Sequence, residues 1–161
     1  PTEFNYAAGA SPYDATRLID QKADEKTQLH LASSLDVEEE SDPVVGWLVV
    51  IKGPGLGQSI NIGGGMNTVG RGVECRVSLP FGDTLISGDD HLRIIYDDSH
   101  RSFLLAPGTG KNITRANGQV VSSTMPITNR SIIELSKKTT VRFMSFCDDT
   151  FDWSDISASE T

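Results

Sequence analysis

The sequence predicts an all-β fold, an antiparallel β-sandwich of short strands. Runs of four to seven residues rich in β-branched, aliphatic and aromatic side chains are separated by clusters of Gly, Pro, Asn and Asp. These turn clusters recur about every 8–12 residues, which is typical of sandwiches. No stretch repeats apolar residues at helical spacing over three turns, so a helical domain is not expected.

Seven runs are expected to form the strands. They are residues 46–51, 59–62, 75–81, 92–97, 102–107, 131–136 and 140–146. The loop from Gly53 to Gly57 resembles a dinucleotide-binding loop, but a strand follows where that fold requires a helix, so we expect a hairpin turn. The loop from Gly108 to Lys111 resembles a phosphate loop, yet Asn112 stands where Ser or Thr must bind magnesium, which argues against nucleotide hydrolysis.

Charge divides the chain into three parts. The 161-residue chain has a net charge of −8, but residues 1–43 hold ten acidic and three basic side chains, and residues 148–161 hold five acidic and none basic. Residues 44–147 therefore keep eleven basic and seven acidic side chains, with 14 of the 15 glycines. We predict a disordered acidic tail over 1–43, a β-sandwich over 44–147 and an acidic C-terminal extension over 148–161.

Several classes of protein are excluded by what the sequence lacks. It has no run of 18 apolar residues and no secretion signal, so we expect a cytoplasmic protein without membrane insertion. Cys75 and Cys147 do not fit a zinc knuckle or a disulfide scaffold and are expected to be reduced and buried. The three histidines lack metal-ligand spacing, and no nucleophile has an adjacent base. We therefore predict no metal, no cofactor and no catalysis.

An ordered set of loop residues remains. Gly70-Arg71 follows a short strand, Ser87 and His91 lie in the next loop, and residues 112–118 read Asn-Ile-Thr-Arg-Ala-Asn-Gly. This order resembles the forkhead-associated (FHA) domain of bacterial type, where Gly-Arg is followed by Ser-x-x-His and then by Asn-Gly-Thr-x-x-Asn-Gly. The resemblance spans residues 44–147. It implies a sandwich of about eleven strands whose end loops bind phosphothreonine peptides.

The resemblance implies that Arg71, Ser87 and Asn112 bind the phosphopeptide and that Lys111 adds positive charge at the rim. The chemistry agrees, because phosphothreonine has close to two negative charges and three acceptor oxygens, so its receptor needs fixed donors and a permanent cation. Ser87 offers a hydroxyl and a backbone N–H. The amide of Asn112 supplies both a donor and an acceptor, which matches a peptide unit.

Gly70, His91 and Asn117 are expected to support the site, with Asn117 in a tight turn. The sequence also departs from the family pattern. Ser87 and His91 are separated by three residues rather than two, so either one residue is inserted and His91 points inward, or Asp90 replaces the family's His. The other departures are Gly88, Asp89 and Ile113. With these departures, a domain that keeps the FHA fold but no longer binds a phosphopeptide stays an alternative.

Two threonines in the acidic tail are candidate phosphorylation sites. FHA domains often select the third residue after the phosphothreonine, which is Ile19 for Thr16 and His30 for Thr27, so Thr16 ranks first. The resemblance thus implies a non-catalytic adaptor in a Ser/Thr kinase pathway, downstream of such a kinase. Its partner is a phosphothreonine protein, its own tail through a flexible tether, or a second copy.

Two other functions stay open at this point. One is a scaffolding sandwich with a degenerate phosphate pocket that binds a protein partner without phosphorylation. The other is a nucleic-acid binder that uses the basic body. Against the second, the basic residues are scattered, aromatic and basic residues do not interleave along a strand, and both acidic ends repel a polyanion. We therefore predict no nucleic-acid partner.

Overall fold

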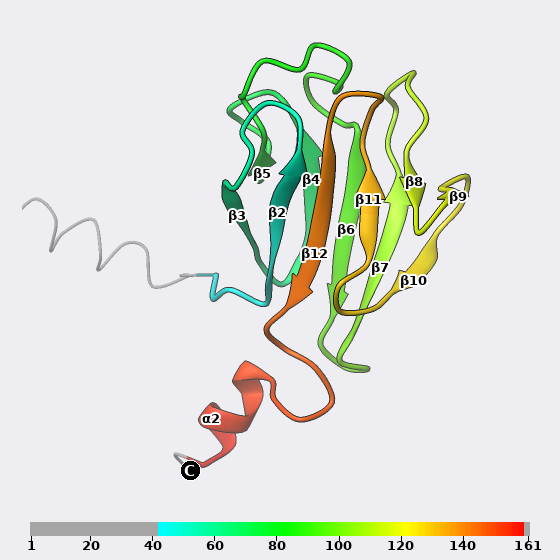
Figure 1. Cartoon of the computed structure of the whole chain (residues 1–161). Helices are drawn as coiled ribbons and strands as arrows, with labels where there is room; N and C mark the ends of the chain where they lie inside the picture. Colours follow the sequence, from blue (N-terminus) through cyan, green and yellow to red (C-terminus); the bar gives the residue numbers. More distant parts are fainter. Residues whose placement is uncertain (1–41, 160–161) are drawn as a thin grey trace, which may run out of the picture. The chain divides into compact units, whose positions relative to one another are not determined.

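The computed structural model describes residues 42–159, which form two β-sheets packed face to face (Figure 1). The five-stranded sheet has the order β10 (Met125–Ile127), β7 (Ser102–Pro107), β6 (Leu92–Asp97), β4 (Gly65–Gly70) and β5 (Val77–Ser78). The six-stranded sheet has the order β3 (Ser59–Ile62), β2 (Gly46–Lys52), β12 (Thr140–Ser145), β11 (Ile132–Glu134), β8 (Arg115–Ala116) and β9 (Gln119–Val120). A short helix, α2 (Trp153–Ser159), follows them. The expected all-β sandwich is confirmed, with eleven strands in the described residues.

The predicted strands and the observed ones differ in two ways. The run 75–81 forms only the two-residue β5, and β5 pairs in parallel with β4, so the five-stranded sheet is mixed rather than wholly antiparallel. The seven predicted runs also omit β8, β9 and β10, and they give no bounds for β4, although a short strand was expected before Gly70-Arg71. Of these, β10 contains Pro126, which is tolerated because β10 is an edge strand that pairs only with β7.

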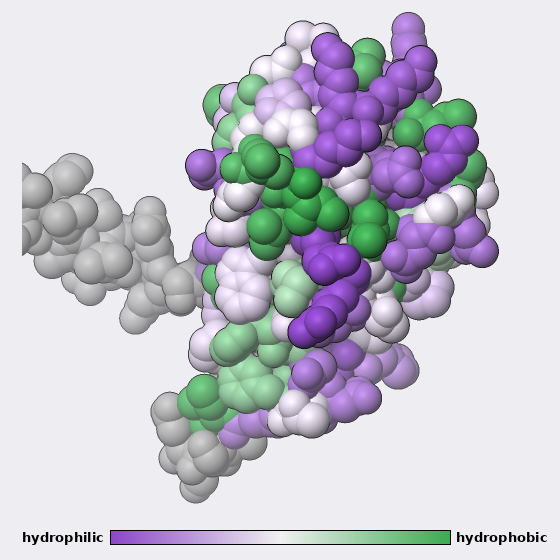
Figure 2. Space-filling model, in the orientation of Figure 1, coloured by the Kyte–Doolittle hydropathy of each residue, from purple (hydrophilic) through white to green (hydrophobic). Residues whose placement is uncertain are grey.

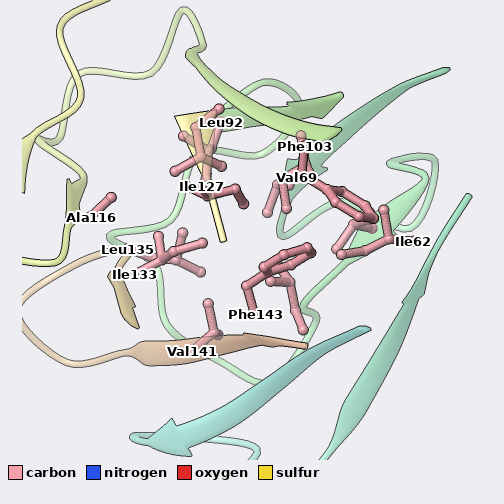
Figure 3. Packing of buried hydrophobic residues seen from close by; sticks show 14 of the residues in the cluster. Ile62, Val69, Leu92, Phe103, Ala116, Ile127, Ile133, Leu135, Val141 and Phe143 are labelled. Atoms are coloured by element: carbon pink, nitrogen blue, oxygen red, sulfur yellow. The ribbon is translucent and has the colours of Figure 1, made fainter. Parts of the chain in front are cut away.

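The core lies between the sheets and is built by the alternation of side chains along each strand. In β6, Leu92, Ile94 and Tyr96 are buried while the residues between them are only partly covered. Figure 3 shows the apolar side chains of both sheets meeting in one cluster, in which the rings of Phe103 and Phe143 lie 4.6 Å apart. Burial of this surface is the main stabilising contribution to the fold.

Aromatic side chains hold the C-terminal extension against the domain. Phe151 and Trp153 contact the ring of Phe146, which directly follows β12, with ring centroids 5.4 and 5.6 Å away. The indole N–H of Trp153 donates to the carbonyl oxygen of Val44 at 2.7 Å. Helix α2 therefore begins at a residue that is fixed to the sandwich. Both cysteines are buried and free, and no described helix is long and apolar enough to cross a membrane.

Four of the loops that the strand register brings to one end of the sandwich form the candidate site. These loops join β4 to β5, β5 to β6, β7 to β8 and β11 to β12, and they lie at the top of Figure 1, opposite α2. All the predicted site residues of the body fall in or beside these loops, except Asn117 in the β8–β9 turn. The candidate phosphosites Thr16 and Thr27, and the tail that carries them, lie outside the described residues.

Candidate functional site

Arg71 is positioned by the end of β4. Gly70 allows the chain to approach the neighbouring loop closely, since a Cβ there would lie 2.7 Å from Cys75 Sγ and 3.0 Å from the Ser87 oxygen. The backbone N–H of Arg71 donates to the Ser87 carbonyl at 2.8 Å, and its Nε donates to the Ile86 carbonyl at 2.9 Å. Among the described residues the guanidinium forms no ion pair. It is therefore oriented by backbone and keeps its two terminal nitrogens for a ligand.

Ser87 is held by His91. The Ser87 N–H donates to His91 Nδ1 at 2.9 Å, and the other ring nitrogen lies 2.7 Å from the Leu135 carbonyl. A carbonyl only accepts, so Nε2 carries the proton and the ring is neutral. Burial lowers the pKa of His91, against the opposing effects of the Leu135 carbonyl and of the charge on Asp83. His91 points inward, as expected if one residue is inserted between Ser87 and His91. The structure corrects one expectation, because the Ser87 N–H is occupied and only the hydroxyl is available to a ligand.

Asn112 connects the β7–β8 loop to the β5–β6 loop. Its Nδ2 donates to the Leu85 carbonyl at 2.6 Å, which fixes the orientation of the amide and leaves Oδ1 and one N–H available. Gly110 lets the loop come close, since a Cβ there would lie 2.9 Å from the Ser87 Cβ. Lys111 is exposed beside it. Three consecutive carbonyls thus position the two side chains. The Leu85 carbonyl orients Asn112, and the carbonyls of residues 86 and 87 orient the side chain and the backbone of Arg71.

Asp83 anchors the segment that carries these carbonyls. Its side chain is 2% exposed and accepts hydrogen bonds from Ser136 Oγ at 2.5 Å, Thr139 Oγ1 at 2.6 Å and the Leu85 N–H at 2.9 Å. These bonds tie the β5–β6 loop to the β11–β12 turn. Asp83 is not among the site residues predicted from the sequence. The available local signal was an aspartate two residues before Leu85, which is the spacing of an Asx-turn.

The four predicted ligand-binding residues line one hollow of about 330 Å³, which we call the anion hollow. Thr84, Gly88, Asp89, Thr109 and Gly110 also line it, and neither threonine is among the site residues that the sequence predicted. Asp89 is the one carboxylate among the lining residues of the hollow.

Asp90, the second acidic residue at which this chain departs from the family pattern, is paired with a cation. Its carboxylate accepts from Arg93 Nε at 3.1 Å and from Arg93 Nη2 at 2.6 Å. The hydrogen bonds from Arg93 are the main reason why the pKa of Asp90 is lowered. The charge of Asp90 is therefore largely compensated, and the anion hollow has two cations, Arg71 and Lys111, against Asp89.

A second hollow, of about 500 Å³, adjoins the first and shares Leu85, Lys111 and Asn112 with it. Leu85 and the 57%-exposed Ile113 give it apolar walls. Its charged lining residues are Lys111, Arg115, Lys137 and Glu134. The adjoining hollow thus suits an aliphatic side chain with a carboxylate nearby.

Asn117 does not line the anion hollow. Asn117 and Gly118 have φ angles of 50° and 86°, and they form the tight turn that joins β8 to β9. The Asn117 Oδ1 accepts from the Ile132 N–H at 2.9 Å. It therefore braces β8 against β11. Among the described residues no group of His, Cys, Asp and Glu side chains is arranged as metal ligands.

Comparison with known proteins gives matches at the level of structure. The sequence matches no protein-family model and no curated protein. A solved FHA domain studied for phosphothreonine-dependent interactions is 26% identical over 62% of this chain and 95% of that chain, with a TM-score of 0.53. The FHA domain of FhaA, solved with the intracellular domain of another protein, is 26% identical over 61% of this chain and 98% of that chain, with a TM-score of 0.51.

The MEK1 FHA domain, solved with a phosphothreonine peptide of HOP1, is 25% identical over 65% of this chain and 99% of that chain, with a TM-score of 0.50. These matches cover nearly the whole length of domains with the same sandwich. The loops that carry Gly70, Arg71, Ser87 and His91 meet at one end of it in this chain. The described residues therefore have the fold of a forkhead-associated domain.

Proposed function

We propose that this domain reads phosphothreonine in a partner protein and is a binding module rather than an enzyme. The observation that carries the proposal is the convergence of Arg71, Ser87, Lys111 and Asn112 on the anion hollow, with the Arg71 guanidinium free of ion pairs among the described residues. A dianionic phosphate ester would meet the guanidinium, the Ser87 hydroxyl and the Lys111 ammonium there. The phosphothreonine-dependent FHA domains among the similar structures support the same ligand class.

The test is calorimetry with the unphosphorylated full chain and a peptide of residues 10–23 phosphorylated on Thr16. Arg71→Ala removes up to two charge-assisted bonds, each worth about 1.5–3 kcal/mol, so we expect the affinity to fall by roughly 100-fold or more. Lys52→Ala is the matched control, because Lys52 is exposed at the end of β2 and lines neither hollow. No heat from the wild-type chain at high micromolar peptide rejects the tail phosphosite as a ligand, and the same result with a degenerate library of phosphothreonine peptides rejects the proposal itself.

The finer part of the proposal is that the ligand includes the chain's own tail. The aliphatic walls and cationic rim of the adjoining hollow suit Ile19 and Asp20, which follow Thr16, better than His30, which follows Thr27. A flexible tether gives an effective concentration up to the millimolar range, so a micromolar affinity suffices for self-occupancy. If phosphorylation of Thr16 in the full chain leaves the affinity for added phosphopeptide unchanged, self-occupancy is wrong.

The upstream partner in this proposal is a cytoplasmic Ser/Thr kinase that phosphorylates Thr16 or a threonine in another protein. A scaffolding domain with a degenerate pocket is the alternative, and Asp89 beside Arg71 is the observation that favours it. Recovery of the same partner proteins with wild-type and Arg71→Ala chains would support the scaffold. Loss of those partners would support the phosphothreonine reader.

A further inference from the structure

The adjoining hollow holds more positive charge than a single carboxylate can neutralise. Lys111, Arg115 and Lys137 line it, and Glu134 is the one acidic residue among its lining residues. Three cations against one carboxylate leave two positive charges in excess. A carboxylate of the peptide in this hollow brings one negative charge, so the second positive charge keeps no partner.

The three cations are exposed and come from different parts of the fold. Lys111 is in the β7–β8 loop, Arg115 begins β8 and Lys137 is in the β11–β12 turn. Glu134 lies opposite Arg115 in the register of β11 with β8, where it offsets the charge of Arg115. Neither lysine forms an ion pair with another described residue. Figure 2 shows hydrophilic residues gathered at this end of the sandwich, over the β11–β12 turn of Figure 1. The two lysines therefore carry the excess charge.

The adjoining hollow is close enough to the anion hollow for one peptide to occupy both. Leu85, Lys111 and Asn112 line both hollows, and Asn112 Nδ2 donates to the Leu85 carbonyl at 2.6 Å in this shared wall. An extended peptide advances about 3.3 Å per residue, so a side chain in the adjoining hollow follows the phosphothreonine by about two to five residues. This is the order already proposed for Ile19 and Thr16.

A phosphate monoester matches the excess charge of this hollow. It carries close to two negative charges at neutral pH and three acceptor oxygens, and the ammonium groups of Lys111 and Lys137 offer only donors. The hollow, of about 500 Å³, is larger than the anion hollow of about 330 Å³, so a phosphate fits its size. Leu85 and Ile113 provide apolar contacts for the carbon atoms of the phosphorylated side chain.

We propose that the adjoining hollow is a second phosphate-binding subsite, so that the preferred ligand carries a phosphothreonine and a second phosphorylated residue about two to five positions after it. The inference rests on the proposed function, because the first phosphate has to occupy the anion hollow. Neither Thr16 nor Thr27 has a Ser, Thr or Tyr two to five positions after it. A doubly phosphorylated partner protein therefore binds more tightly than the singly phosphorylated tail and displaces it.

Calorimetry with the unphosphorylated full chain and degenerate phosphothreonine peptides tests the proposal. One set of peptides has phosphoserine at a fixed position after the phosphothreonine, and a matched set has glutamate there. The fixed position is in turn the second, third, fourth and fifth residue, and all other positions are random. At about 0.15 M salt, where charges more than about 8 Å apart are largely screened, we expect phosphoserine to bind at least about fivefold more tightly than glutamate at one or more of these positions.

Lys137→Ala removes one cation of the adjoining hollow and should lower the ratio of phosphoserine to glutamate affinity at least about threefold. Lys138→Ala is the matched control, because Lys138 is the next exposed residue of the same turn and lines neither hollow, so this ratio should stay within about twofold of the wild type. Equal affinities of the two sets at all four positions overturn the second subsite, as does a gain that Lys137→Ala leaves unchanged. Absence of binding by every set overturns the proposed function as well.

Discussion

Asp83 is the residue whose replacement best tests how the anion hollow is built. Its carboxylate holds the segment that presents the carbonyls of residues 85 to 87 to Arg71 and Asn112. Asp83→Asn keeps the shape of the side chain but replaces one acceptor oxygen with an NH₂ group. Oδ1 accepts from the Leu85 N–H and Oδ2 accepts from two hydroxyls. If the NH₂ group takes the place of Oδ1, it meets the Leu85 N–H donor to donor. If it takes the place of Oδ2, the hydroxyl of Thr139 can accept from it, but Ser136 Oγ already accepts from two backbone N–H groups.

The magnitude follows from these contacts. Hydrogen bonds to a charged group contribute about 1.5–3 kcal/mol each, and the amide loses at least one bond and weakens the others, so we expect a loss of about 2–4 kcal/mol in unfolding free energy. For a domain of this size that corresponds to a melting temperature lower by roughly 10 °C. If the substitution leaves one loop residue without a fixed backbone, ordering that residue again on binding costs about 1–2 kcal/mol. The affinity for a phosphopeptide should therefore fall about 5- to 30-fold.

Urea denaturation and calorimetry of the same preparation measure both effects. Asp98→Asn is the control, because Asp98 is exposed in the β6–β7 turn at the other end of the sandwich. If Asp83→Asn retains the stability and affinity of the wild type, the anchoring role is refuted. If only stability falls, the β5–β6 loop is positioned by other contacts.

The pH dependence of stability gives an independent check on Asp83. Burial alone would raise its pKa, but hydrogen bonds from Ser136, Thr139 and the Leu85 N–H outweigh burial, and the pKa of the folded state is lowered. A lowered pKa stabilises the fold above the unfolded value of about 3.9, and this contribution is lost as the pH falls through the folded value. The stability difference between wild type and Asp83→Asn should therefore shrink below about pH 4.

Two further substitutions test close contacts. Gly70→Ala places a methyl group 2.7 Å from Cys75 Sγ and 3.0 Å from the Ser87 oxygen, so we expect unfolding free energy to fall by about 1–3 kcal/mol in urea titrations; an unchanged midpoint would contradict the close approach. Tyr96→Phe removes a 2.5 Å hydrogen bond to the buried Asp152 and should cost about 1.5–3 kcal/mol by the same assay. A loss below about 0.5 kcal/mol would show that Asp152 is satisfied without the phenol.

The strands that the sequence predicted are those long enough to show alternation. β6 has three buried residues separated by outward ones, and its predicted bounds agree with the structure. β8 and β9 have two residues each, and β8 exists because Ala116 pairs with Ile133, a residue distant in sequence. A two-residue strand has no period of its own, so only tertiary pairing defines it.

The same distinction applies to the site. Arg71, Ser87 and Asn112 could be named because their order along the chain resembles a known pattern. Asp83 could not, because its partners Ser136 and Thr139 are 53 and 56 residues away and become neighbours only after folding. Side chains that touch a ligand tend to leave a local pattern, whereas those that position them depend on contacts between distant loops.

The extra residue between Ser87 and His91 shows how the fold absorbs a departure from the family pattern. The N–H groups of Arg71 and Gly72 donate to the carbonyls of Ser87 and Gly88, so Ser87 is fixed from the β4 side as well as by His91. The insertion is taken up by the bend that follows, where Asp89 joins the wall of the anion hollow.

Asp90, next in that bend, turns to Arg93 and accepts the Gly110 N–H on its carbonyl at 3.0 Å, which ties the bend to the β7–β8 loop. The position of the donors is thus preserved while one negative charge is added beside them. Because the donors are held by backbone bonds and not by the net charge of the hollow, we expect Asp89 to weaken the proposed anion binding without changing which donors line the hollow. The positions of the donors in the anion hollow and its net charge are therefore determined by different residues.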